Sequence, residues 1–173
     1  DKEFNHPISL KLETKIVNII KSKIDFFDVI VLSDYSKGLL TDNLLKTTIE
    51  LSRKKNKLVI VDPKKSDFSP YKGANIITPN FKELLEASKI KKILQNEDDP
   101  NMVVRLSKEL LKKYNFDAIV TTRSSDGISI VDKKNASLHL PSKAQEVFDV
   151  SGAGDTVIAY ICLLYTSDAA DED

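Results

Sequence analysis

The chain has 173 residues, of which 41% are hydrophobic and 30% are charged, which predicts one soluble globular domain and excludes a large multi-domain machine. Its 26 basic side chains balance its 26 acidic ones, so the broad positive field of a nucleic-acid binder is missing. The apolar runs are too short to cross a bilayer and no signal peptide is visible, so we expect a cytoplasmic protein. One cysteine and two histidines are too few for a disulfide or a His/Cys zinc site.

Helical and strand patterns alternate along the chain. The short apolar run at 28–33 predicts a strand buried on both faces, and Thr41 is placed to cap the helix that follows. In the first half of the chain we expect a helix over 8–24, a strand over 28–33, a helix over about 42–55, and strands over 58–61 and 74–77. Pro79 and Asn80 then open a further helix, and a polar loop follows over 90–100. In the last part we expect a helix over 102–114, a strand over 118–121, two short strands between 127 and 140 around a turn at 133–135, and a helix from about 153. This alternation predicts an α/β domain with a parallel sheet covered on both faces, whose ligands gather beyond the carboxyl ends of the strands.

The two ends of the chain differ from the rest. Residues 162–172 resemble the translation of a sequencing adapter, which predicts a non-native tail over 162–173 and a body that ends at residue 161. Without that tail the chain loses four acidic side chains and no basic one, so its net charge rises to +4, which suits an anionic substrate. The other reading is a helix from Ala153 that runs on to an acidic end. The first residues include no initiator methionine, so we also expect a truncated beginning.

The most informative segment is the glycine turn before the last predicted helix. Gly152, Ala153 and Gly154 let the backbone turn tightly, and the helix that follows begins with N–H groups that have no partner within it. Such donors, together with the helix dipole, bind a phosphate or a developing oxyanion. Asp155 stands in the first turn, where a carboxylate can take the proton of an acceptor hydroxyl during phosphoryl transfer. The alternative is that Asp155 only stabilises the helix N-terminus, by about 0.3–1 kcal/mol.

Asn80 and Glu83 stand three residues apart at the start of a predicted helix, so they share one face of its first turn. Their amide and carboxylate oxygens suit the water shell of Mg²⁺ beside the phosphates of ATP. The same spacing is that of a capping box, with Asn80 as the N-cap and Glu83 reaching back. Taken alone, the capping interpretation is favoured.

Polar residues also follow three of the strands. The segment from Thr122 to Gly127 permits turns and exposes backbone donors, which fits either a nucleotide contact or an ordinary polar hairpin. A carboxylate and a lysine stand after two other strands, as Asp34 with Lys37 and as Asp62 with Lys64. Lysine suits a phosphate, although any solvated turn can display one. We take Asp34, Lys37 and Lys64 as candidates for substrate or phosphate binding.

The run from Asp149 to Asp155, Asp-Val-Ser-Gly-Ala-Gly-Asp, closely resembles the C-terminal signature of the ribokinase-like, or PfkB, family of sugar kinases. The resemblance implies a three-layer, Rossmann-like parallel sheet of the ribokinase type, incomplete at both ends of this chain. It implies that Asp155 is the catalytic base and that the amides of Gly152, Ala153 and Gly154 form the anion hole. The nucleotide and its magnesium would then be contacted by Asn80, Phe81, Lys82, Glu83, Thr122, Ser124 and Gly127.

Four motifs narrow the resemblance to the branch that phosphorylates D-glycero-β-D-manno-heptose 7-phosphate, which includes the kinase half of the bifunctional ADP-heptose synthase. They are Leu-Ser-Asp-Tyr-Ser-Lys-Gly at 32–38, Val-Asp-Pro-Lys at 61–64, Thr-Pro-Asn-Phe-Lys-Glu at 78–83 and Phe-Asp-Val-Ser-Gly-Ala-Gly-Asp-Thr at 148–156. Ser36 departs from the family's wording, which has glycine there, and is tolerable unless the turn needs a positive φ. The branch implies ATP- and Mg²⁺-dependent phosphorylation of the anomeric hydroxyl, which gives a 1,7-bisphosphate on the route to lipopolysaccharide core heptose.

The resemblance covers residues 1–161, which correspond to the carboxyl-side part of such a kinase. The sugar-binding strands upstream and the helices that complete the adenine pocket are missing, so we expect the 173-residue chain to be inactive and marginally folded. Its partners would be ATP and a sugar phosphate, with no nucleic acid and no membrane; a monovalent cation and a homodimer of the intact parent are left open.

Other functions stay as alternatives or are disfavoured. Another sugar kinase of the family, acting on fructose phosphate or ribose, is the nearest alternative, and a non-catalytic phosphosugar or nucleotide sensor is a second. Neither a Gly-x-Gly-x-x-Gly fingerprint after an early strand nor a P-loop occurs, which disfavours dinucleotide oxidoreductases and P-loop enzymes. His6, near one end, and His139, in a predicted strand, give poor support to Ser/His/Asp catalysis.

Overall fold

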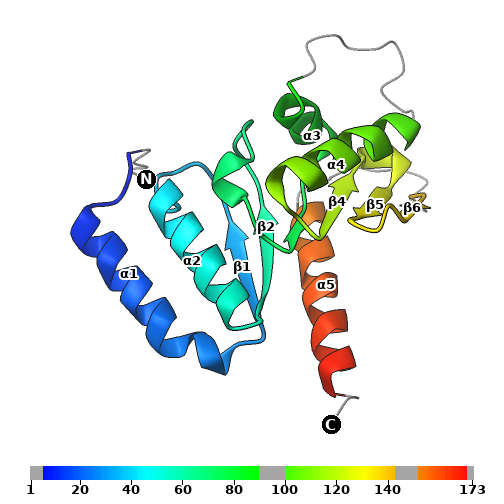
Figure 1. The fold of residues 1–173 in the computed structure, drawn as a ribbon. Coiled ribbons are helices and arrows are strands. Elements are labelled where there is room, and N and C mark those ends of the chain that lie inside the picture. The colour runs from blue at the N-terminus through cyan, green and yellow to red at the C-terminus, as the bar shows by residue number, and fades with distance from the viewer. Residues whose placement is uncertain (1–5, 90–99, 143–151, 171–173) are drawn as a thin grey trace.

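The computed structural model describes residues 6–89, 100–142 and 152–170 and shows a six-stranded sheet with helices on both faces (Figure 1). The strands lie across the sheet in chain order: β1 (Val29–Ser33), β2 (Leu58–Asp62), β3 (Ile76–Ile77), β4 (Ala118–Thr122), β5 (Ile128–Asp132) and β6 (Ser137–Leu140). Each strand from β1 to β4 is parallel to its neighbours in that set, whereas β5 and β6 extend the sheet as an antiparallel hairpin. The predicted parallel sheet and the two short strands that follow it are therefore confirmed.

The helices also agree with the hydrophobic pattern. They are α1 (Leu10–Lys23), α2 (Asp42–Lys54), α3 (Phe81–Ala87), α4 (Pro100–Tyr114) and α5 (Ala153–Ala170), with 3₁₀ turns η1 (Ile24–Phe26), η2 (Ser69–Tyr71) and η3 (Ser124–Asp126). The polar loop predicted over 90–100 lies outside the described residues, apart from residue 100, which begins α4. Within the described ranges, no helix combines the length and the apolar character needed to span a membrane.

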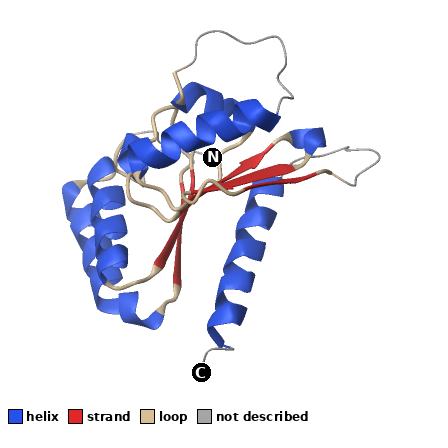
Figure 2. Cartoon of the chain, turned by 45° about the vertical axis from the view of Figure 1, so that its right-hand side comes forward, coloured by secondary structure: helices blue, strands red, loops and turns tan. Residues whose placement is uncertain are grey.

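Side chains alternate along β2 and divide the core into two layers. Val59 and Val61 pack in the larger core, which includes the buried faces of α2, α3 and α4. Leu58 and Ile60 point to the opposite face, where they pack with Ile158 of α5. Figure 2 shows α5 on the side of the sheet opposite the other helices. The expected three-layer α/β architecture is confirmed.

The expectation that the first strand is buried on both faces is wrong. Leu32 is the one buried residue of β1, and Val31 on the same strand is 43% exposed. Within the described residues β1 is an edge strand, because β2 is its sole neighbour in the sheet. The apolar stripe of α1 is partly uncovered: Leu12 and Ile19 are 44% and 51% exposed, whereas Ile16 and Ile20 are half-buried.

A buried carboxylate joins α1 to α2. The side chain of Glu13 accepts hydrogen bonds from the Thr41 hydroxyl and from the Asn43 amide, and these bonds lower the pKa of Glu13. Thr41 is also the N-cap of α2, as predicted, because its hydroxyl accepts the Leu44 amide at 3.1 Å. Glu13 thus adds a negative charge at the positive end of the α2 dipole, which favours the packing of the two helices.

Candidate active site

A cavity of about 860 Å³ lies at the carboxyl ends of β1, β2 and β4, beside the N-termini of α3 and α5. This is where the sequence pattern places ligands in a parallel α/β sheet. The predicted site residues that line it are Asp34, Lys64, Asn80, Phe81, Lys82, Glu83, Thr122, Ser124, Gly127 and Gly154. Lys37, Gly152 and Asp155 are not part of its wall, and Ala153 is the first residue of α5.

The capping box predicted for Asn80 and Glu83 is present. Asn80 Oδ1 accepts the Glu83 amide at 2.8 Å, and Glu83 Oε2 accepts the Asn80 amide at 2.9 Å. The structural role and the place at the cavity therefore coexist, because the box fixes both side chains at its wall. Lys64 lies 3.4 Å from Glu83 Oε1 and joins the loop after β2 to this turn.

The donor set at the Asn80–Glu83 turn is compatible with a magnesium ion held through its water shell. No cluster of three or more His, Cys, Asp or Glu side chains suited to hold a metal ion occurs among the described residues. Asn80 and Glu83 offer hard oxygen atoms, which hydrogen-bond well to the water shell of Mg²⁺. Each carboxylate oxygen of Glu83 has lone pairs beyond its one protein contact, so the capping box does not prevent this.

Asp62 is a member of the site that the candidate residues did not include. It is the last residue of β2 and lines the cavity. Burial raises the pKa of Asp62, the negative charges of Glu83 and Asp155 raise it further, and a hydrogen bond from Ser33 opposes them. An acidic residue that ends an apolar strand was the available signal.

The glycine turn leads into α5 as expected, although 143–151, with the first half of the signature, lie outside the described residues. Gly152 has φ +80°, in the left-handed region that favours glycine. Its carbonyl accepts both the amide and the hydroxyl of Thr156, each at 2.9 Å. Gly154 and Thr156 then line the cavity, while Asp155 is exposed beside it.

The segment from Thr122 to Gly127 is both a hairpin connection and a part of the cavity wall. The Thr122 amide donates to the Pro79 carbonyl at 3.1 Å, and Thr122 forms an isolated bridge with Asn80. The end of β4 is therefore fixed against the N-terminus of α3. Gly127 has φ +87°, and a Cβ there would stand 2.0 Å from the Leu140 carbonyl oxygen, so this turn requires glycine.

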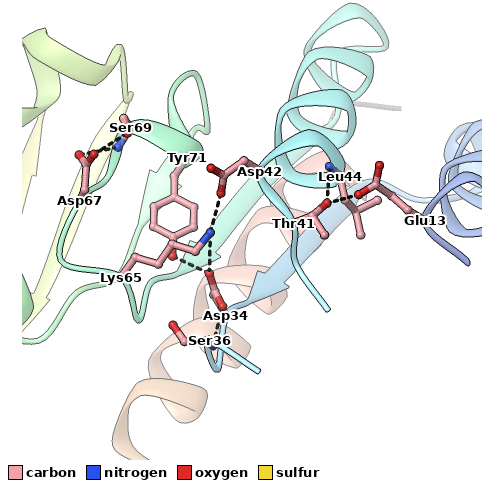
Figure 3. Close-up of polar contacts among 10 residues, drawn as sticks. All are labelled: Glu13, Asp34, Ser36, Thr41, Asp42, Leu44, Lys65, Asp67, Ser69 and Tyr71. Carbon is pink, nitrogen blue, oxygen red and sulfur yellow. Dashed lines mark hydrogen bonds and ion pairs between the residues drawn. The ribbon is translucent and has the colours of Figure 1, made fainter. Parts of the chain in front are cut away.

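The loop after β1 is held by a buried carboxylate, as Figure 3 shows. Asp34 Oδ2 accepts the Tyr71 hydroxyl at 2.7 Å, and Asp34 Oδ1 accepts the Ser36 amide at 2.7 Å. Burial and this hydrogen bond raise the pKa of Tyr71, which keeps its hydroxyl protonated and donating. Lys65 lies 4.0 Å from Asp34 and 2.8 Å from Asp42. Asp34 thus has protein partners at both oxygens.

The turn after Asp34 does need a positive φ, which is the condition under which Ser36 was expected to be unfavourable. Ser36 has φ +54°, a conformation that glycine adopts at lower cost than serine. The hydrogen bond from its amide to Asp34 holds it there.

A model of the pfkB family of carbohydrate kinases matches residues 4–168. The chain belongs to this family. The predicted pfkB signature and the predicted α/β fold of pfkB kinases are thereby confirmed. The bifunctional protein HldE of Geobacter sulfurreducens is 42% identical over 161 residues, which are 93% of this chain and 32% of that protein. The bifunctional protein HldE of Syntrophotalea carbinolica is 38% identical over 163 residues, 94% of this chain and 32% of that protein. The chain spans about a third of the length of these pfkB relatives.

Solved structures of two kinases have the same fold. Phosphofructokinase-2 from Escherichia coli, in complex with potassium, gives a TM-score of 0.76 at 16% identity, over 94% of this chain and 51% of that one. Ribokinase from Arabidopsis thaliana, complexed with ribose and ATP, gives a TM-score of 0.62 at 16% identity, over 91% of this chain and 46% of that one. At this identity the likeness shows the fold alone.

Proposed function

We propose that residues 1–161 are the carboxyl-side part of an ATP- and Mg²⁺-dependent kinase domain that phosphorylates the anomeric hydroxyl of D-glycero-β-D-manno-heptose 7-phosphate. The single observation that carries the proposal is the shared cavity, which joins the Asn80–Glu83 turn, the N-terminal turn of α5 and the end of β2. The matches to bifunctional HldE proteins, and the four motifs quoted above, favour the heptose branch over other members of the family. Residues 162–173 are, in this proposal, a non-native tail.

In the proposed reaction, the anomeric oxygen forms a bond to the γ-phosphorus of ATP as the bond from that phosphorus to the β,γ-bridging oxygen breaks. The hydroxyl proton passes to the Asp155 carboxylate, and ADP leaves with the electron pair of the broken bond. The amides of Gly152, just before α5, and of Ala153 and Gly154, its first two residues, donate to the charge that develops on the migrating group. Magnesium, held through water by Asn80 and Glu83, supplies neutralisation of the phosphate charge when it is bound.

The two ends of the cavity divide the ligands in this proposal. Thr122, Ser124 and Gly127, with Phe81 and Lys82, line the end at β4 and are assigned to the nucleotide. Asp34, after β1, and Lys64, after β2, line the other end of the cavity, where the sugar phosphate would lie. Lys37 belongs to the same loop as Asp34. Both carboxylate oxygens of Asp34 already have protein partners, which favours a role in holding the loop after β1 over direct contact with the sugar phosphate.

The test is phosphoryl transfer by the natural full-length protein that carries this chain. We expect ³¹P NMR to show a heptose 1,7-bisphosphate formed from ATP, with kcat/KM for heptose 7-phosphate well above the values for fructose 6-phosphate and ribose. Asp155→Asn should remove most of the turnover and leave ATP binding intact. Asp28→Asn is the matched control, because Asp28 is an exposed carboxylate just before β1, at the opposite end of the sheet from the cavity.

Three outcomes would contradict the proposal. Higher kcat/KM for fructose 6-phosphate or ribose would assign the chain to another sugar kinase of the family. ATP binding without turnover on any of these sugars would favour a non-catalytic sensor. Unchanged turnover in Asp155→Asn would refute the role of the carboxylate.

A further inference from the structure

An exposed aromatic side chain stands at the sugar end of the cavity. Tyr35 is 61% exposed and lines the cavity two residues beyond the end of β1. Large aromatic side chains that remain in water at a concave site have apolar area available for a ligand. In the same wall, Asp62 and Lys64 supply polar and charged groups, so the Tyr35 ring adds an apolar surface to a polar pocket.

Hydrogen bonds of a buried side chain fix the loop that carries Tyr35. The side chain of its neighbour Asp34 is only 3% exposed and receives hydrogen bonds from Tyr71 and from the amide of Ser36 (Figure 3). Tyr71 is fully buried in η2, and its side chain also has backbone hydrogen bonds with Lys64 and Lys65 in the loop after β2. Tyr35 is thus flanked on both sides by anchored residues, which reduces the entropy lost when its ring meets a ligand.

The position of Tyr35 in the sheet separates it from the proposed nucleotide end. β1 and β4 are three strand positions apart, which is roughly 14 Å at the usual spacing between strands. The segment assigned to ATP follows β4, whereas Tyr35 follows β1. This separation favours contact of Tyr35 with the phosphate acceptor over contact with the adenosine of ATP.

From these observations we infer that the ring of Tyr35 packs against the apolar C–H face of the sugar ring of the acceptor, and that Tyr71 acts through Asp34 as a positioning residue for this contact. The inference rests on the proposed kinase function and adds to it a residue that contacts the sugar. The inference gives Tyr35 no contact with a phosphate. Tyr35 therefore affects the affinity for the sugar and not the rate of phosphoryl transfer.

The first test compares Tyr35→Leu, Tyr35→Phe and the control Phe26→Leu in the natural full-length protein. Phe26 is also exposed, at 78%, but precedes β1 and so lies at the opposite end of that strand. We expect Tyr35→Leu to raise KM for the sugar phosphate about 3- to 10-fold, as loss of an aromatic contact does, with kcat and the KM for ATP unchanged. Tyr35→Phe keeps the ring and should raise KM for the sugar phosphate less than Tyr35→Leu does, whereas Phe26→Leu should leave all three parameters near their original values.

The second test removes the anchor. Tyr71→Phe deletes the hydroxyl that donates to Asp34, and Tyr114→Phe is its control, because the Tyr114 hydroxyl donates to Asp67 at 2.9 Å in the same aromatic cluster. We expect Tyr71→Phe to raise KM for the sugar phosphate about 2- to 5-fold, and the effect should shrink in the Tyr35→Leu background because the two residues act as one unit. Tyr114→Phe should lower the Tm without changing KM.

The outcomes separate the two proposals. Absence of any phosphoryl transfer by the unsubstituted protein would overturn the proposed function and this inference with it. Normal transfer with an unchanged sugar-phosphate KM in Tyr35→Leu, or a rise in the KM for ATP instead, would overturn the inference alone. Equal KM values in Tyr71→Phe and Tyr114→Phe would refute the positioning role.

Discussion

The carboxylate of Asp62, at the end of β2, lies within electrostatic reach of Asp155 in the first turn of α5. The two residues are far apart in the sequence, and α5 covers the face of the sheet opposite to α2, α3 and α4. Gly154 and Thr156, on either side of Asp155, line the same cavity as Asp62, so the N-terminal turn of α5 lies at the carboxyl end of the sheet. This relationship ties Asp155 to the cavity even though its side chain is not part of the wall.

Removing the charge of Asp155 should lower the pKa of Asp62. In Asp155→Asn the folded chain loses one of the negative charges that raise this pKa, so the value should fall toward that of an ordinary aspartate. A ¹³C NMR titration of the Asp62 carboxyl group measures the change. Asp28→Asn is the control, and it should leave the pKa of Asp62 unchanged. An unaltered Asp62 titration in Asp155→Asn would place the two carboxylates apart.

The same shift has a consequence for stability. Because the pKa of Asp62 is raised in the folded state, folding favours the protonated form, and this contribution is complete below the ordinary pKa and lost as the pH rises through the raised one. Asp155→Asn should therefore reduce the decrease in the free energy of unfolding between the ordinary pKa of an aspartate and the raised pKa of Asp62. Urea unfolding of the 173-residue chain at a series of pH values gives the measurement.

Gly154→Ala should separate folding from catalysis. A Cβ at Gly154 meets no atom within 4 Å and the residue lines the cavity, so alanine fits the chain and would occupy space that the proposed phosphate needs. We expect the free energy of unfolding to stay the same or rise by up to about 1 kcal/mol, because alanine is the better helix former. Turnover of the full-length protein should fall by about 10-fold or more through steric exclusion of the phosphoryl group.

The control for that variant is Gly152→Ala. Its φ of +80° makes alanine unfavourable, so we expect a loss of about 1–2 kcal/mol in the free energy of unfolding. Full activity in Gly154→Ala would argue against a phosphate beside this turn.

Gly127→Ala should damage both the fold and the nucleotide end of the cavity. The new Cβ would stand 2.0 Å from the Leu140 carbonyl oxygen and 2.7 Å from the Ser142 amide nitrogen, and both residues line the cavity. Backbone must move to relieve such contacts, which costs about 2 kcal/mol or more together with the unfavourable φ. Thermal unfolding checks the stability, and the KM for ATP should rise in the full-length protein. Gly73→Ala shares the φ of +87° but approaches only the Ile49 side chain, at 3.5 Å, so it isolates the effect of backbone strain.

Ser36→Gly should stabilise the loop after β1. Serine at φ +54° is less favourable than glycine, although glycine loses more entropy on folding, so the net gain should be up to about 1 kcal/mol. Chemical denaturation of the 173-residue chain measures it. If the variant were less stable, the serine side chain would have to make a favourable contact that outweighs the strain.

Local patterns in the sequence predicted much of this fold and part of the site. The apolar run of β2, the Thr41 cap and the capping box of Asn80 and Glu83 each depend on residues close together in the chain, and each is confirmed. The exposure of β1 could not be predicted, because burial of a strand depends on its neighbours in the sheet rather than on its own apolar residues.

Contacts across long stretches of chain account for the rest. Tyr71 meets Asp34 across 37 residues, and no local pattern links a tyrosine in a short 3₁₀ turn to the loop after a distant strand. Asp62 was visible as an acidic residue at a strand end, but its neighbours Glu83 and Asp155 come from two other elements. Ser36 combines a positive φ with a hydrogen bond to Asp34, and the identity of the residue does not indicate either of them.

The buried Glu13 between α1 and α2 makes the first helix an acid-sensitive latch. Because its hydrogen bonds lower the pKa of Glu13, this carboxylate is ionised at neutral pH and holds α1 against α2. The contact weakens when acid protonates Glu13, at a pH below the ordinary pKa of a glutamate. Leu12 and Ile19 of α1 are exposed, so the Glu13 hydrogen bonds supplement a modest apolar contact between the two helices. Only strong acidification, to a pH below the ordinary pKa of a glutamate, is therefore expected to separate α1 from α2.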